Sequence, residues 1–318
     1  MSKLIVSTSP HVHTKLTTQK IMRDVLIALA PATVAGVVFF GLKALLTIVL
    51  CVGTAVLSEF LFNLITKKKQ TVGDLSACVT GLLLALSLPA KIGIFECIVG
   101  SVFAIIVVKC LFGGLGCNFA NPAVTARVFL LISFVSAGGG SHTVFQDVDM
   151  VGSATPLQIL ASEDTSKLPS LLDMFLGNRM GAIGETCAIA LIIGFIYLVI
   201  RKIINWHTPV IYVGTVFVLS LFIEKFDFAA ALYQVLSGGL IIAAIFMITD
   251  YVTTPINKYG KMVFALGCGL LTVLIRYLGD LPEGVSYAIL IMNILSPYIE
   301  KLCEKKPFGK AGKKNEEK

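Results

Sequence analysis

The sequence predicts an all-α integral membrane protein with about ten transmembrane helices in two inverted five-helix repeats. Of its 318 residues, 56% are hydrophobic and 14% are charged, whereas soluble domains are about 45–50% apolar and about 25% charged. The mean hydropathy of +0.88 agrees. The apolar runs are continuous rather than alternating, which favours helices over barrel strands.

Ten apolar stretches account for the expected helices. The third and fifth are short for a hydrocarbon core of about 30 Å, so they are expected to be broken, tilted or re-entrant. The polar N-terminus has no apolar core of a signal peptide, so the first stretch is expected to direct insertion. The stretches are 25–42, 44–65, 74–89, 92–112, 122–135, 184–200, 208–223, 229–249, 261–278 and 284–299.

The distribution of basic residues predicts the orientation. With the N-terminus in the cytoplasm, 20 Lys and Arg fall inside, Lys109 and Arg127 among them, and five fall outside, including Arg179. This excess predicts that both termini are cytoplasmic. The net charge of +7 is therefore an orientation signal, and no nucleic-acid partner is expected.

An even number of spans, five before the longest polar loop and five after it, gives the two repeats opposite orientations. The chain then divides into a cytoplasmic N-terminal segment, a first repeat, an extracytoplasmic loop, a second repeat and a basic cytoplasmic tail. Their boundaries are 1–24, 25–135, 136–183, 184–299 and 300–318.

The eight cysteines lie mostly in apolar stretches, and none forms a Cys-x-x-Cys pair. This pattern argues against a disulfide framework and against an iron–sulfur cluster held by this chain alone. Buried apolar packing is the expected role. No metal site is predicted.

The polar loop carries the most informative motif, Asp149-Met150-Val151-Gly152-Ser153-Ala154-Thr155. It resembles the site at which bacterial flavin transferases attach FMN to a threonine hydroxyl through a phosphoester, with Gly152 and Ser153 in the reverse of the usual order. The candidate site residues are Asp149, Ser153, Ala154 and the acceptor Thr155. The alternative is a polar loop with ordinary turn chemistry.

A second candidate site opens the fifth stretch. Asn118 and Asn121 lie three positions apart, next to a glycine cluster and Pro122. Glycines allow close approach to the backbone, and amides offer both donors and acceptors, which suits the pyrimidine edge of a flavin ring. The alternative for Asn121 is a helix N-cap with proline at the first helical position.

Three acidic or basic residues lie in or beside apolar stretches. Glu59 and Arg276 are costly in lipid, which leaves an ion path, a structural pairing or a contact with a neighbouring subunit as their roles. Asp250 could equally form hydrogen bonds to the turn that contains Thr253 and Thr254.

The motif Gly-Gly-Leu-Gly-x-Asn-x-x-Asn-Pro-Ala-x-x-x-Arg-x-Phe-Leu, residues 113–130, resembles the core signature of a family of membrane proteins. That family contains the D subunit of the Rnf electron-transport complex and the B subunit of the sodium-pumping NADH:quinone oxidoreductase. The likeness extends to 9–11, 21–29, 249–255, 267–276, 282–284 and 288–293, and the short N-terminal segment favours the Rnf member.

The resemblance implies a multi-pass subunit in a bacterial cytoplasmic membrane. Its complex passes electrons between ferredoxin and NAD and pumps Na+ or H+. It further implies covalent FMN at Thr155, a non-covalent riboflavin at Asn118 and Asn121, and as partners the other Rnf subunits and a flavin transferase. Catalysis by the chain alone is not expected, because it has neither a nicotinamide-binding glycine fingerprint nor cluster ligands. A transporter or channel of similar architecture and a purely structural scaffold are the alternatives.

Overall fold

The computed structural model describes residues 17–138, 155–161, 168–279 and 283–304. Thr155, Asn118 and Asn121 lie within these ranges, whereas Asp149, Ser153 and Ala154 lie outside them. The regular structure of the described residues is helical, which confirms the predicted all-α class.

Seven helices of the described residues precede the polar loop, and an apolar stretch of the sequence corresponds to each long one. Helix α1 begins after Thr17, whose hydroxyl accepts a hydrogen bond from the Lys20 N–H. The N-terminal helices are α1 (Thr18–Phe40), α2 (Leu42–Ile65), the short η1 (Val72–Asp74), α3 (Ser76–Ser87), α4 (Ile94–Val102), its π-helical continuation η2 (Phe103–Cys110) and α5 (Pro122–Ser133).

The remaining helices follow the same apolar pattern after three short turns of helix. These short helices are η3 (Val135–Gly138), α6 (Pro156–Ala161) and α7 (Leu171–Leu176). The long helices are α8 (Ala188–Ile200), α9 (His207–Ile223), α10 (Phe228–Leu236) with α11 (Leu240–Ile242) and the π-helical η5 (Ala243–Met247), α12 (Lys258–Leu278) and α13 (Gly284–Leu302).

Helix length separates the candidate membrane spans into two kinds. Among the described residues, α1, α2 and α12 are long and apolar enough to cross a membrane, and α10 with its continuation makes a fourth if that pair, bent by 65°, counts as one span. Helices α3 and α5 have 12 residues each, or about 18 Å at about 1.5 Å per residue. As predicted, the third and fifth stretches are short.

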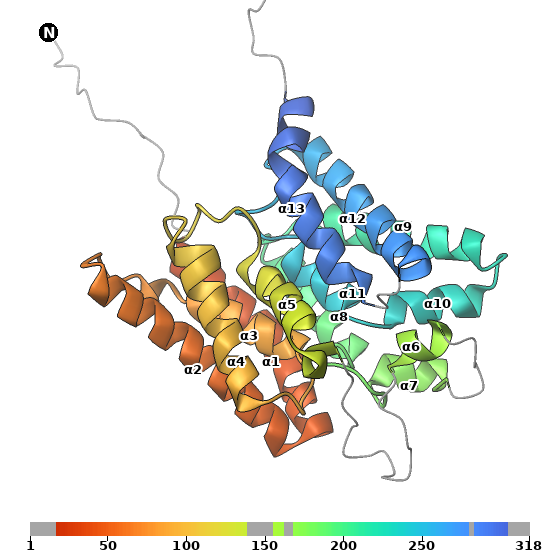
Figure 1. Cartoon of the computed structure of the whole chain (residues 1–318). Coiled ribbons are helices and arrows are strands. Elements are labelled where there is room, and N and C mark those ends of the chain that lie inside the picture. The colour runs from red at the N-terminus through yellow and green to blue at the C-terminus, as the bar shows by residue number, and fades with distance from the viewer. Residues whose placement is uncertain (1–16, 139–154, 162–167, 280–282, 305–318) are drawn as a thin grey trace, which may run out of the picture.

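Figure 1 shows α1–α4 on one side of the molecule and α9, α12 and α13 on the other, with α5 between them. Besides a small cluster between α2, α3 and η2, two large hydrophobic cores hold the described helices together. One combines α1–α5 with α8, so an element from after the polar loop packs among those before it. The other combines α9, α12, α13 and η5 with Val124 of α5. Helix α5 packs against both α3 and α13 and therefore lies between the two cores.

The structure corrects one part of the charge count. Lys109 and Arg127, counted as inner loop charges, and Arg179, counted as an outer one, are each at most 3% exposed. Lys109 lies in η2 and Arg127 in α5, where each pairs with a carboxylate. Arg179 lies in the segment between α7 and α8, but it is buried and donates to the Glu185 carbonyl. Removing them leaves 18 inside (20 minus 2) and four outside (5 minus 1). The bias toward one side survives.

Candidate functional site

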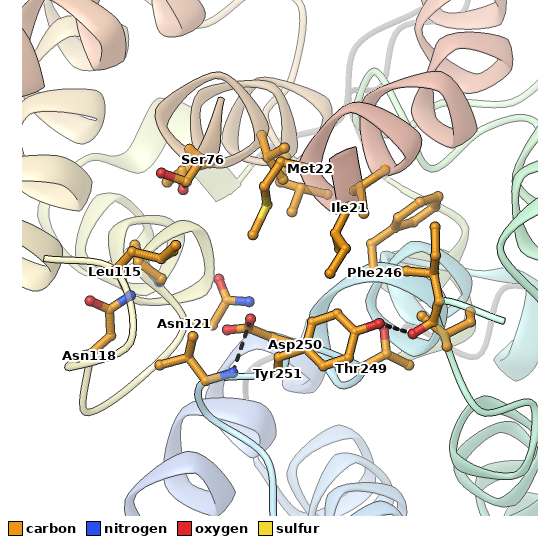
Figure 2. A pocket seen from close by; sticks show the side chains of 18 of the residues that line it. Ile21, Met22, Ser76, Leu115, Asn118, Asn121, Phe246, Thr249, Asp250 and Tyr251 are labelled. Carbon is orange, nitrogen blue, oxygen red and sulfur yellow. Dashed lines mark hydrogen bonds between the residues drawn. The ribbon is translucent and has the colours of Figure 1, made fainter. Parts of the chain in front are cut away.

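A cavity lies where α1, α3, the start of α5 and the segment after η5 meet (Figure 2). It measures about 80 Å³ and is open to the outside. A three-ring ligand is larger than this volume, so it would extend beyond the cavity. Both predicted asparagines line this cavity.

Asn121 is the N-cap of α5, which confirms one of its two predicted roles. Its side-chain oxygen accepts hydrogen bonds from the Ala123 and Val124 N–H groups at 3.0 and 3.4 Å. Its amide nitrogen donates to the Met247 carbonyl at 3.5 Å, which ties α5 to η5. With the amide of Asn293 turned to donate to the Thr253 carbonyl, the Asn293 oxygen accepts from the Asn121 N–H at 3.1 Å.

Asn118 is in the opposite situation, because its side-chain oxygen is buried and has no hydrogen-bond partner within the described residues. It follows a turn in which Gly113, Gly114 and Gly116 all have positive φ, a conformation that favours glycine. A buried amide oxygen without a donor costs about 1–3 kcal/mol. This atom is therefore available to a ligand with an N–H group.

Lys109 and Ser76, which also line the cavity, belong to an ion-pair network that the sequence pointed to only through Glu59. Lys109 Nζ lies 2.9 Å from both carboxylate oxygens of Glu59 and 2.6 Å from Ser76 Oγ. Thr71 also donates to Glu59, at 2.6 Å. Of the predicted roles of Glu59, the structure contains the structural pairing, and its partner is Lys109. Lys109 lies within the apolar stretch 92–112, and this unusual position could have identified it as the partner of Glu59.

Asp250, in the segment after η5, gives the cavity a carboxylate. Its Oδ2 accepts from the Thr253 hydroxyl at 3.0 Å, while its main-chain carbonyl accepts from the Thr254 hydroxyl at 2.6 Å. The predicted hydrogen bonding to this turn is confirmed. Burial raises the pKa of the Asp250 carboxyl, and the Thr253 hydrogen bond partly opposes that rise. The neighbouring Tyr251 hydroxyl donates to the Ile203 carbonyl (Figure 2).

Thr155 is buried and immediately precedes α6. Its N–H donates to Gln158 Oε1 at 2.8 Å, and its hydroxyl oxygen accepts from the Gln158 N–H at 3.4 Å, a reciprocal capping arrangement. Within the described residues the hydroxyl serves only as an acceptor, and an ester oxygen keeps a lone pair for that role. Esterification at Thr155 is therefore compatible with the cap.

Close to α6, a cluster of charged side chains lies around the break between α10 and α11. Arg127 of α5 forms an ion pair with Glu283 and lies 3.8 Å from the Glu185 carboxylate. Arg276 donates to the carbonyls of Gln234 and Ser237 at 2.6 and 3.1 Å. Sequence reasoning singled out Arg276 but not the two glutamates.

Helix α5 connects the asparagine cavity to this charged cluster. Asn121 caps the helix and Arg127 lies six residues further on, about 9 Å along the axis. The molecule therefore combines an apolar cavity with unused amide capacity, a buried threonine hydroxyl and an internal charged cluster on packed helices. Such an arrangement can hold prosthetic groups inside a membrane protein.

Comparison with known proteins identifies the family of this membrane protein. The family described as NQR2, RnfD, RnfE matches residues 5–309. The D subunit of the Na(+)-translocating ferredoxin:NAD(+) oxidoreductase complex of Acetobacterium woodii is 43% identical over 309 residues, covering 96% of this chain and 95% of its own. The proton-translocating counterpart of Clostridium ljungdahlii is 41% identical and covers 96% of each chain. The D subunit of the ion-translocating oxidoreductase complex of Stutzerimonas stutzeri is 33% identical over 92% of each.

The chain belongs to the NQR2, RnfD, RnfE family. The three relatives all carry the name of the D subunit of an ion-translocating oxidoreductase complex. The resemblance deduced from the motif at 113–130 is therefore confirmed.

Proposed function

We propose that this chain is the flavin-carrying membrane subunit of an ion-pumping complex that transfers electrons between ferredoxin and NAD. The observation that carries the proposal is the asparagine-lined cavity with its unpartnered amide oxygen. It occurs in a family whose members above are named as subunits of such complexes. A solute transporter or a scaffold would have no need for a redox cofactor in this cavity.

Riboflavin is the ligand proposed for the cavity. A bound flavin supplies a ring that accepts and releases electrons, while the chain binds and orients it. Phe246, Tyr251 and Met22 line the cavity and offer apolar surface to a flat ring. The free oxygen of Asn118 can accept a hydrogen bond from the ring N–H of the pyrimidine edge.

FMN is proposed as the group attached to Thr155 by a flavin transferase. The support is the motif that ends at Thr155, together with a hydroxyl that donates no hydrogen bond within the described residues. Because Thr155 is buried, the acceptor must become accessible during attachment. Attachment is therefore expected to precede or accompany the packing of α6.

The proposed membrane arrangement follows the ten apolar stretches. Five spans on each side of the polar loop give inverted repeats, with both termini in the cytoplasm and Thr155 on the outer side. The asparagine cavity then lies nearer the cytoplasm. Flavins at these two sites would provide a route for electrons through the membrane rather than along one face. The other subunits of the complex are the proposed electron partners.

The coupling ion is not specified by overall similarity. One relative is named as sodium-translocating and another as proton-translocating, and the chain is 43% and 41% identical to them. We therefore propose ion coupling of Na+ or H+. Measurement of ferredoxin:NAD activity in vesicles of the whole complex, with and without Na+, distinguishes the two.

The test of the proposed function is covalent flavin on the denatured chain. The chain is produced with a flavin transferase, resolved on a denaturing gel and viewed under ultraviolet light. We expect a fluorescent band for the wild type and Ser153→Ala, and none for Thr155→Ala present in the membrane at equal amount. A wild type without fluorescence would contradict the proposal, and a loss only in Ser153→Ala would move the attachment site.

A further inference from the structure

We propose that Arg127, Arg179 and Arg276 form an anion site that binds the phosphate group of the flavin on Thr155. The identity of the ligand rests on the proposed function, whereas the anion site itself rests on the buried charges and donors of the structure. We call these three residues the arginine cluster.

The arginine cluster and two carboxylates form one continuous unit, in which Arg276 and Glu283 are partly exposed and the other three residues are buried. Arg127 pairs with Glu283 and lies near Glu185, and Arg179 Nη2 donates to the Glu185 carbonyl at 2.6 Å. Arg276 interacts electrostatically with both glutamates. The side chains of Arg127, Arg179 and Glu185 are each at least nine-tenths buried.

The charges of this unit do not cancel. Three guanidinium groups face two carboxylates within the described residues, which leaves one uncompensated positive charge. A buried charge is costly unless an opposite charge or hydrogen bonds compensate it. The unit as described is thus one negative charge short of neutrality.

The hydrogen bonds point to the same deficit. Within the described residues, three buried guanidinium nitrogens have no acceptor: Arg127 Nη1, Arg179 Nε and Arg276 Nε. The buried hydroxyls of Thr186 and Ser237 also have no partner there. Most of the unpartnered buried side-chain atoms of the described residues gather in this region. Five available donors indicate a ligand that presents acceptor oxygens. A phosphate diester has such oxygens, and arginine binds them well.

The break between α10 and α11 brings the arginine cluster toward Thr155. A Cβ on Gly238 would lie 3.2 Å from Arg276 Nη2 and 2.7 Å from Leu157 Cδ1, and one on Gly239 would lie 3.1 Å from Glu185 Oε1. Leu157 is two residues after Thr155 in the chain. Gly238 therefore lies between Arg276 of the arginine cluster and Leu157, which belongs to the first turn of α6 after Thr155.

A phosphate ester at Thr155 would supply the missing charge. A diester between the Thr155 oxygen and a flavin carries one negative charge, equal and opposite to the excess of the unit. The arginine cluster then binds and neutralises the phosphate, while the flavin ring extends beyond it. This assigns a function to Arg276 other than pairing with a carboxylate.

The test compares the full-length chain purified with and without the flavin transferase. Adding inorganic phosphate to the flavin-free wild type should raise its Tm by about 2–4 °C, relative to sodium chloride of equal ionic strength. The flavin-bearing chain should show no such rise, because its site is already filled. Arg276→Gln should lose the phosphate effect in the flavin-free chain, and Arg276→Lys should retain part of it.

Arg201→Gln is the matched control, since Arg201 is half-exposed and pairs with Asp24 far from the cluster. It should keep the full phosphate effect. The differences between conditions, rather than the absolute Tm, are compared, so a general loss of stability in Arg276→Gln does not affect the result.

The outcomes separate this proposal from the proposed function. If phosphate does not raise the Tm of the flavin-free wild type, or raises it equally in Arg276→Gln, there is no anion site in the cluster. If phosphate stabilises both flavin-free and flavin-bearing chains equally, the anion comes from another source, such as a phospholipid, and the assignment to FMN is wrong. Absence of covalent flavin from the wild type would overturn the proposed function. The effect of phosphate on the flavin-free chain would still show whether the cluster is an anion site.

Discussion

Two buried charged networks in this chain differ in how completely their hydrogen bonds are satisfied. Around Lys109, every donor of the ammonium group has an acceptor, two on Glu59 and one on Ser76. Around Arg127, Arg179 and Arg276, each guanidinium group retains a buried nitrogen without an acceptor among the described residues. In the first network Lys109 pairs with Glu59, and Ser76 in turn donates to the Asp74 carboxylate, so no positive charge is left over. The second contains one positive charge in excess.

The difference distinguishes a structural pairing from a ligand site. Buried polar groups are normally hydrogen-bonded, so a complete network needs nothing further. A network with unused donors and an unbalanced charge is explained by a partner that protein atoms do not supply. The Lys109 network fixes α2, α3 and η2 to one another, whereas the arginine cluster surrounds a break between helices beside the proposed FMN attachment residue.

The largest expected effect breaks the complete network. Lys109→Met leaves the Glu59 carboxylate, 1% exposed, without its charge partner, which costs about 3–5 kcal/mol in such cases. We expect a marked fall in Tm of the purified chain. The double variant Glu59→Leu with Lys109→Met removes both charges and should recover much of the loss. A single variant as stable as the wild type would show that this pair is not structural.

A smaller effect is expected at the asparagine cavity. Asn118→Leu removes the one amide oxygen that the described part of the fold does not use, so the fold should be retained. A bound riboflavin would lose one hydrogen-bond acceptor, at about 1–3 kcal/mol, so less riboflavin should be extracted from the purified variant. Asn205→Leu, at an exposed position, is the control. Equal riboflavin in both variants would leave Asn118 without a role in binding.

The smallest effect is expected at the pair between half-exposed Arg201 and buried Asp24. Arg201→Gln removes the partner that lies 2.9 Å from the Asp24 carboxylate, but Tyr197 still donates to that carboxylate at 3.3 Å. Because water screens the exposed guanidinium group, the fall in Tm should be smaller than that of Lys109→Met. If Arg201→Gln lowered the Tm as much as Lys109→Met, the stability contributed by an ion pair would not follow the burial of its basic residue.

The helices were largely predictable from the sequence, because continuous apolar runs determine them locally. Asn121 before Pro122 also predicted the start of α5 at its observed residue. The apolar pattern predicts a start at residue 25 for the first helix, whereas α1 begins at Thr18, because its first turn is polar and its Thr17 cap carries the signal instead. The break after Leu236 was not predicted, although Gly238 and Gly239 lie within the eighth stretch.

The arginine cluster was not predictable in the same way. Arg127 and Glu283, which form its ion pair, are 156 positions apart, so no local pattern connects them. Charge counting assigned Arg127 and Arg179 to the polar boundaries of the membrane, because a basic residue by itself gives no sign that it is buried and paired. Only the packing of α5 against α13 brings the partners together.

The most direct measurement counts the two flavins on this chain. The full-length chain, produced with a flavin transferase and riboflavin, is precipitated with acid, and flavin is quantified in the pellet and the supernatant. We predict one covalent FMN per chain, on the peptide that contains Thr155, and one extractable riboflavin. Flavin in neither fraction, from a chain that remains folded, would contradict the proposed function.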